Sequence, residues 1–383
     1  MNLTEEASRL IDYSPLFASN IGVGCSATDS AVAVAEAYLD GKPRRRGKHK
    51  TTRAQRDAAF WSSKFLFTLP VEAWDTEPLV LALARYMGQE PMSNVVLLEH
   101  VAAADAAMDA ADAVVIVAAT DAHAGIIRAA LARDLPTFCE KPLASTLEES
   151  VSLAAEIGAA SAPVQVGFQR RFDPAYVEAR RLIESGELGD IYTMSMRSHD
   201  PEPASEEFIA SSGGMFSDLS IHDLDVLRYL SGREATEVYC VGSAEGFPQF
   251  AKYDDYATAV ALISLEGGIP LTLTWTRHDP LGHDVRAEVF GSRDSVAVGL
   301  GPRTPIRSVE PGVPPPAGPA WTIFLDRWDD AYRDELLAFV EVAAGRLENP
   351  CTASDGVEAL RLAEALTVSA REHRLVRMDE VRA

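Results

Sequence analysis

The feature that most constrains the fold is an apolar stretch inside residues 109–119, where positions 111–119 read Ala-Asp-Ala-Val-Val-Ile-Val-Ala-Ala. This stretch is too apolar to expose either face, and it therefore predicts a strand buried on both sides, as in a parallel sheet. The surrounding chain alternates strands with helices in the way that such a sheet requires. Further strands are expected at 65–74, 95–98, 136–139 and 163–168, and helices at 77–87, 120–131 and 147–160. We therefore predict an α/β domain over residues 1–168, built on a doubly wound parallel sheet.

The pattern changes after residue 168. Alternating or apolar strands are expected at 191–198, 237–242, 256–265, 269–276, 285–290 and 295–300, with one helix starting near residue 213. Several strands without intervening helices, and a hairpin signal at Glu266-Gly267-Gly268, indicate an antiparallel sheet. Residues 169–383 therefore predict an α+β domain with a large open antiparallel sheet. Its closing helices are expected at 330–342 and 355–374, after an extended, exposed proline-rich loop at 302–319.

The composition narrows the class of protein. A chain of 383 residues favours two domains, and a formal net charge of -22 argues against nucleic acid or an anionic membrane as a partner. No apolar run approaches the roughly 20 residues that cross a bilayer, and the amino terminus does not resemble a signal peptide. The four cysteines are widely spaced, which is typical of reduced thiols and gives no metal-site pattern. We therefore expect a cytoplasmic protein without a structural metal.

Several positions in the first domain are candidates for binding a dinucleotide. Residues 21–27 contain Gly22 and Gly24 in a loose G-x-G-x-x-A pattern, although the strand before them is poor. Asp75 follows an expected strand, where an acid binds ribose hydroxyls, but a helix cap is an equal alternative. Ligands of such sheets lie at the carboxyl ends of the strands. Further cofactor contacts are therefore expected from Thr120, His123, Glu140 and Lys141, with Thr120 or Asp121 also capping the helix that follows.

In the second domain, Asp218 and His222 stand four residues apart at the start of an expected amphipathic helix. Side chains at this spacing share one helical face, and an imidazole beside a carboxylate is suited to moving a proton. Most such pairs cap or solvate a helix. A catalytic interpretation therefore needs partners from elsewhere in the chain.

Three segments together supply such partners. They are Glu140-Lys141-Pro142, Gly167-Phe168-Gln169-Arg170-Arg171-Phe172-Asp173-Pro174, and the stretch from Gly213 to Asp225. With these three segments in this order, the amino-acid sequence from about residue 65 onward resembles the glucose-fructose oxidoreductase and inositol dehydrogenase (Gfo/Idh/MocA) family. Within it, His199-Asp200-Pro201 and the segment 207–214 are most similar to bacterial myo-inositol 2-dehydrogenases.

The resemblance implies a Rossmann domain that holds NAD or NADP, and a sheet domain that covers the nicotinamide and often mediates homo-oligomerisation. It implies hydride transfer between this cofactor and a secondary hydroxyl of a cyclic polyol or sugar. His222 would be the base, Lys141 would orient the hydroxyl and stabilise charge on its oxygen, and Asp218 would hold the imidazole or bind a neighbouring hydroxyl. Substrate contacts are expected from Arg171, Asp173, His199 and His283, with structural salt bridges or loop caps as the alternative.

The chain departs from the family pattern at two places. Residues 281–286 read Leu-Gly-His-Asp-Val-Arg where inositol dehydrogenases carry a tyrosine-rich segment, which leaves the identity of the polyol open. Gly22 lies 53 residues before Asp75, whereas the family has roughly 25 to 30 residues in this interval. A basic insertion at 42–56, a lost or replaced first β-α unit, and a reading-frame error in the gene are alternative explanations. A competing hypothesis is therefore a relative that binds a sugar or a partner protein without redox turnover.

Overall fold

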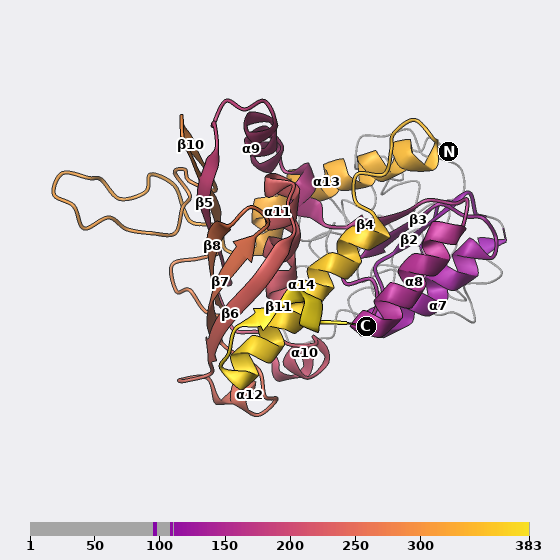
Figure 1. Cartoon of the computed structure of the whole chain (residues 1–383), viewed down its shortest axis with the longest axis horizontal. Helices are drawn as coiled ribbons and strands as arrows, with labels where there is room; N and C mark the ends of the chain where they lie inside the picture. The colour runs from indigo at the N-terminus through magenta and orange to yellow at the C-terminus, as the bar shows by residue number, and fades with distance from the viewer. Residues whose placement is uncertain (1–94, 98–107, 110, 383) are drawn as a thin grey trace, which may run out of the picture. The chain divides into compact units, whose positions relative to one another are not determined.

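The computed structural model describes residues 95–97, 108–109 and 111–382, without the side chains of 95–97. It divides into two compact units (Figure 1). Unit 1 comprises the residues up to Ala144, Ser152–Gly167 and Leu336–Ala353, and unit 2 comprises Ser145–Val151, Phe168–Glu335 and Ser354–Ala383. The chain therefore passes between the units several times, and a segment close to the carboxyl terminus belongs to unit 1.

Unit 1 is built on a four-stranded parallel sheet. Its order is β1-β2-β3-β4, with β1 at Val95–Leu97, β2 at Ala113–Ile116, β3 at Thr137–Glu140 and β4 at Val164–Gly167. Helix α7 (Thr120–Leu131) follows β2, and α8 (Leu147–Ala159) follows β3. Every residue of β2 is buried, as its apolar sequence predicts. The expected parallel α/β sheet is confirmed for the part of the chain that the structure describes.

The core of unit 1 includes residues from the carboxyl-terminal third of the chain. Phe138 of β3 packs against Phe339 with ring centroids 5.9 Å apart, together with Ala113 and Val115. The backbone N–H of Val166 in β4 donates to the carbonyl of Cys351 at 2.9 Å. The returning segment Leu336–Ala353 thus covers apolar surface of the sheet that would otherwise be exposed to water.

Unit 2 contains a seven-stranded sheet of order β10-β9-β5-β8-β7-β6-β11. The strands are β5 (Ile191–His199), β6 (Ala235–Ser243), β7 (Thr258–Leu265), β8 (Ile269–Thr276), β9 (Asp284–Gly291), β10 (Ser295–Val298) and β11 (Val376–Arg377). All neighbours are antiparallel except β5 and β8, which run parallel in the middle of the sheet. Figure 1 shows the helices α9, α11 and α14 on one side of this sheet.

The helical elements of unit 2 are mostly short. They are η2 (Gln169–Phe172), α9 (Pro174–Glu184), α10 (Glu206–Ser211), η3 (Phe216–Ser220), α11 (Ile221–Ser231), α12 (Pro248–Ala251), α14 (Ala353–Glu372) and η4 (Met378–Glu380), together with the first part of α13 (Phe324–Ala343). The sequence did not predict α9, α10, α12 or β11, because each is short or lacks a clear apolar period. The loop between β10 and α13 has neither helix nor strand, and residues 306–317 are all exposed, as expected. Within the described residues, no helix is both long and apolar enough to cross a membrane.

Candidate active site

The carboxyl edge of the parallel sheet carries four of the predicted cofactor contacts. Helix α7 begins at Thr120, four residues after the end of β2, and its N-cap is Ala119 without a side-chain hydrogen bond. The expectation that Thr120 or Asp121 caps this helix is therefore wrong. No side chain caps the first N–H groups of α7, and the role of Thr120 in cofactor binding stays a prediction.

His123 is buried one turn into α7, with an exposed fraction of 1%. Its Nδ1 lies 2.8 Å from the carbonyl oxygen of Pro142, and its Nε2 lies 3.1 Å from that of Ala118. Burial lowers the pKa of this imidazole, although the two carbonyls oppose the change. The ring therefore connects the end of β2 to the turn after β3, and this is a structural contact beside its predicted role in cofactor binding.

Glu140 and Lys141 lie where β3 ends. Glu140 is paired in register with Gly167 of β4. A side chain on Gly167 would place its Cβ 2.9 Å from Phe138 Cζ and 3.2 Å from Glu140 Cα, so only glycine permits this close approach of the two strands. Lys141 follows, partly buried, and is joined to Pro142 by a cis peptide bond. The turn after β3 thus presents a lysine at the carboxyl edge of unit 1.

The stretch around Asp218 begins with a glycine turn and continues as a wide helical turn. Gly213 and Gly214 have φ values of 79° and 88°, a conformation that L side chains rarely adopt. Residues 216–220 form a π-helical turn, and the α-helix starts only at Ile221. The expectation of a regular α-helix from the start of this stretch is wrong in its first turn, because Asp218 lies in the π turn and His222 in the α-helix that follows. Single π turns are frequent at functional sites.

Two contacts fix the side chains of this stretch. Arg277, immediately after β8, donates from Nη1 to Asp218 Oδ2 at 3.0 Å and to Asp200 Oδ2 at 3.3 Å. The ring of Phe168 packs edge-on against the imidazole of His222, with centroids 6.2 Å apart and an interplanar angle of 89°. Both Asp218 and His222 keep part of their surface accessible. They are therefore held from different elements and still reachable by a small molecule.

The tandem arginines of η2 bind two acids of α11. Arg170 donates to Asp223, which also accepts from the indole N–H of Trp275 at 2.8 Å. Arg171 makes two hydrogen bonds to Asp225, from Nε at 2.9 Å and from Nη2 at 2.6 Å. All four charged side chains are buried. These ion pairs explain why α11 carries acids on its buried side, and they hold η2 and β8 against it.

The predicted substrate contacts Arg171 and Asp173 have structural partners. Arg171 also forms an ion pair with Asp355 of α14 at 2.9 Å. Asp173 caps α9 by accepting from the backbone N–H groups of residues 175 and 176, and it binds Arg327 at 2.7 Å. These are the salt bridge and the cap that form the alternative interpretation of the two residues. Their role as hydroxyl binders stays a prediction.

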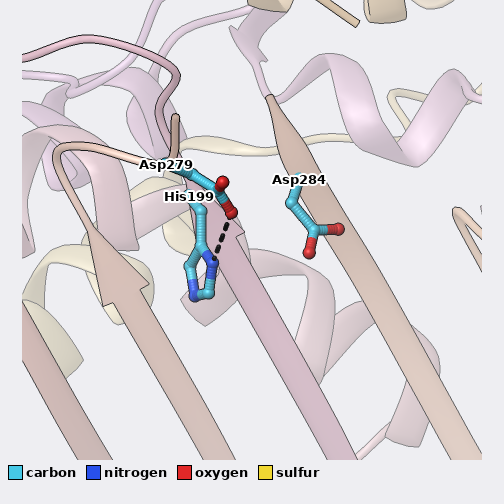
Figure 2. A group of neighbouring side chains, drawn as sticks. All are labelled: His199, Asp279 and Asp284. Carbon is cyan, nitrogen blue, oxygen red and sulfur yellow. Dashed lines mark ion pairs between the residues drawn. The ribbon is translucent and has the colours of Figure 1, made fainter. Parts of the chain in front are cut away.

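His199 lies at the end of β5 in a cluster with two acids (Figure 2). Its Nδ1 is 3.5 Å from Asp279 Oδ2, and its Nε2 is 3.1 Å from Thr274 Oγ1. Asp284 completes the cluster, but both of its oxygens accept from Arg286 at 2.8 Å. Burial lowers the pKa of His199, and the two acids oppose this. Because a guanidinium already neutralises Asp284, we interpret the cluster as an ion-pair network rather than a metal centre.

His283 is buried at the start of β9, with an exposed fraction of 3%. Its backbone N–H donates to the carbonyl of Trp321 at 2.7 Å, and its Nδ1 lies 3.7 Å from Asp200 Oδ1. Burial, together with the positive charges of Arg170 and Arg327, lowers the pKa of this imidazole to about 3. His283 is therefore neutral at physiological pH.

The structure thus groups the predicted residues in two sets. Thr120, His123, Glu140 and Lys141 lie in unit 1, and Asp218, His222, His199 and His283 lie in unit 2. Gly22, Gly24 and Asp75 fall outside the described residues, and their assignment stays a prediction. Sequence reasoning missed Asp200 and Arg277. Their positions in the sequence could have indicated them, because each residue directly follows a strand of the same sheet.

Comparison with known proteins connects both units to one family. Residues 54–168 match the model of an oxidoreductase family with an NAD-binding Rossmann fold, and residues 176–297 match the GFO/IDH/MocA C-terminal domain. The chain is 37% identical over 254 residues to the uncharacterized oxidoreductase YrbE of Bacillus subtilis, and the matched region covers 66% of this chain and 74% of YrbE. It is 36% identical over 261 residues to the myo-inositol dehydrogenase Hyg17 of Streptomyces leeuwenhoekii, which covers 68% of this chain and 78% of Hyg17.

A solved structure agrees with these relatives. The scyllo-inositol dehydrogenase of Lactobacillus casei, solved with bound NAD(H) and scyllo-inositol, is 25% identical. Its TM-score is 0.66, and the similarity covers 86% of this chain and 97% of that one. The parallel sheet of unit 1, the seven-stranded sheet of unit 2 and these matches lead to one conclusion: the chain belongs to the Gfo/Idh/MocA family of NAD-binding oxidoreductases.

Proposed function

We propose that this protein is an NAD(P)-dependent dehydrogenase that oxidises a secondary hydroxyl of an inositol-like cyclic polyol. Family membership supports the reaction class, and the names of the relatives support the substrate class. The nicotinamide, when bound, supplies the hydride acceptor. The protein must then bind and orient the polyol, take the hydroxyl proton and stabilise the charge that develops on the oxygen.

His222 is the proposed base. An imidazole exchanges a proton near neutral pH, and Phe168 holds its plane while part of its surface stays accessible. Asp218, fixed by Arg277, orients the imidazole or a neighbouring hydroxyl. Lys141 is proposed to donate to the reacting oxygen, which an ammonium group can do from the turn after β3. His199 and His283 are the proposed polyol contacts in unit 2.

One observation carries the proposal that Lys141 and His222 serve the same reaction. Residues 54–168, which include Lys141, and residues 176–297, which include His222, match the two domain models of one oxidoreductase family. This shared membership supports a common substrate for the two residues.

The first experiment measures binding and turnover of the full-length protein. Calorimetric titration with NAD and NADP should give micromolar affinity for at least one of them, which separates a dehydrogenase from a relative without redox activity. NADH formation is then followed with a panel of inositols and aldoses. His222→Ala and Lys141→Met should each lower kcat about 100-fold or more, whereas Lys252→Met, at an exposed lysine paired with Glu206, should not. Full turnover by His222→Ala would exclude this base.

We further propose a homo-oligomer and a cytoplasmic location. The face of the seven-stranded sheet away from the helices exposes two cross-strand apolar pairs, Tyr239 with Leu262 and Val241 with Val260. Their exposed fractions are between 38% and 55%. A contiguous apolar patch on a sheet surface is typical of a protein interface. Cys139, Cys240 and Cys351 are buried free thiols, as expected of a reducing compartment.

A further inference from the structure

Arg277 lies beside Asp200 because of a parallel strand pair in the large sheet. Strands β5 and β8 run parallel, and His199 is paired with Thr276 at their ends. The next residues, Asp200 and Arg277, consequently emerge at the same edge, and the backbone N–H of Asp200 donates to the carbonyl of Thr276 at 2.9 Å. The backbone N–H of Arg277 donates to the carbonyl of Ala257 at 2.8 Å. These hydrogen bonds fix the backbone of Arg277, from which its guanidinium group extends.

The guanidinium stands between two acids. Its Nη1 binds Asp218 Oδ2 at 3.0 Å and Asp200 Oδ2 at 3.3 Å, and only 3% of Arg277 is exposed. Burial opposes the charge of Arg277, but Asp218, Asp200 and Asp255 together raise its pKa above the usual range. Burial raises the pKa of Asp200, Arg277 opposes that rise and Asp218 adds to it. One buried cation thus contacts two neighbouring acids and opposes the rise in the pKa of Asp200.

The consequence of losing this cation follows from electrostatics. Two carboxylates that share a partly buried site repel each other, and without an opposite charge one of them retains a proton. Other charged or titratable groups around the pair include Asp255, His283 and Arg170. His283 is neutral, and Arg170 is bound to Asp223. Loss of Arg277 therefore removes a positive charge that lies 3.0 Å from Asp218.

We propose that Arg277 is a positioning residue of the active site, which fixes the Asp218 carboxylate and places a positive charge beside it so that Asp218 can orient the base or the substrate. The inference rests on the proposed function of Asp218 and His222. Arg277 acts through Asp218 and does not itself exchange the proton. Its contribution therefore lies in turnover and in the pH dependence of turnover rather than in NAD affinity.

The test compares Arg277→Gln and Arg277→Lys with a matched control. Arg228 is the control because it also bridges two acids, Glu234 and Asp355, with 10% of its side chain exposed, but at the far end of α11. Arg277→Gln should lower kcat about 10- to 100-fold, as loss of a group that orients a reacting side chain does. The acid limb of its kcat/KM profile should move to higher pH, and Arg277→Lys should recover part of both losses. NAD affinity should stay as in the wild type, and Arg228→Gln should keep both kcat and the profile.

A second readout does not depend on turnover. In protein labelled with ¹³C at the aspartate carboxyls, the Asp218 signal is assigned by its loss in Asp218→Asn. Its titration midpoint should move to higher pH in Arg277→Gln and not in Arg228→Gln. An unchanged midpoint together with an unchanged pH profile would overturn the role of Arg277. Full turnover by Asp218→Asn or His222→Ala would instead overturn the proposed function, and the two failures are thus distinguishable.

Discussion

At the scale of single residues, burial decides which histidines of unit 2 can carry charge. His283 has 3% of its surface exposed, lies near the guanidinium groups of Arg170 and Arg327, and has a pKa lowered to about 3. Its nearest acid oxygen, on Asp200, is 3.7 Å away, which is too far for a hydrogen bond. The folded protein therefore keeps this imidazole neutral over most of the pH range.

The acid sensitivity of the fold should depend on His283. Between pH 6.5 and about 3 the unfolded chain binds a proton at this side chain and the folded chain does not, so the free energy of unfolding falls as the pH falls. The contribution is up to about 1.4 kcal/mol per pH unit in this window. His283→Phe removes the titration. Its melting temperature should fall less than that of the wild type between pH 7.5 and pH 4.5, and equal decreases in both proteins would contradict this explanation.

The sequence predicted individual site residues unevenly. The proximity of Asp218 and His222 along the chain, and their place in a family motif, were enough to select them. Arg277 was not selected, because its contact with Asp218 joins the end of β8 to η3, and no local pattern encodes a contact between segments so far apart in the sequence. For Asp173 the sequence left two interpretations open, a substrate contact and a structural salt bridge or cap; the structure shows the cap of α9, and the substrate contact stays a prediction.

At the scale of elements, buried ion pairs attach η2 and β8 to α11. Arg170 binds Asp223 with both side chains almost completely buried, and Trp275 of β8 donates to the same carboxylate. Replacing a buried pair by apolar groups is often harmless, but removing one partner leaves an uncompensated charge in the interior. The position of α11, and hence of His222 in its first turn, therefore depends on Asp223.

Asp223→Asn tests this dependence. The amide still accepts from Trp275 but leaves the Arg170 charge without its partner, so we expect a loss of about 3 kcal/mol or more in the stability of unit 2. Glu184→Gln is the control, because it removes the partner of Arg180 in a pair that is largely exposed and worth about 1 kcal/mol or less. Denaturation in urea, followed by tryptophan fluorescence, compares the two. Similar losses in both variants would argue against a structural role for the buried pair.

Element boundaries were predicted well where an apolar period is long. The strands at 191–199, 258–265 and 269–276 and the last helix agree with the sequence to within a few residues. The π turn at residues 216–220 was not predicted, because it inserts a wider turn without changing the apolar residues that follow. Helices α10 and α12, of six and four residues, are too short to show a helical period.

At the scale of the whole molecule, the outer face of the large sheet is the surface through which we propose that copies of the protein associate. Its exposed pairs on β6 and β7 form a patch of four large apolar or aromatic side chains. The alternation of buried and exposed positions along both strands predicts which residues face outward. The sequence could not predict that so many of these outward positions are apolar on neighbouring strands, because strand order is a property of the fold.

The proposed oligomer should dissociate when this patch is charged. Leu262→Lys combined with Val260→Glu puts two charges into the apolar pairs, and light scattering after size-exclusion chromatography should show a lower mass than for the wild type. Val309→Glu is the control, since Val309 is 87% exposed in the proline-rich loop. A wild-type protein that is monomeric at micromolar concentration would refute the proposal, as would an unchanged mass in the double variant.

The parallel pair of β5 and β8 also has a consequence for how the chain folds. Parallel neighbours cannot be joined by a tight turn. Here the segment from Asp200 to Gly268 connects β5 to β8, and the chain must close this long loop before His199 can pair with Thr276. Loop closure over such a distance costs chain entropy before any contact is gained, so pairings of this kind form slowly. Asp200 and Arg277 emerge directly from this junction. The acid cluster around Asp218 is thus assembled only when the two halves of the sheet have joined, and refolded protein should acquire its helices before it acquires its catalytic site.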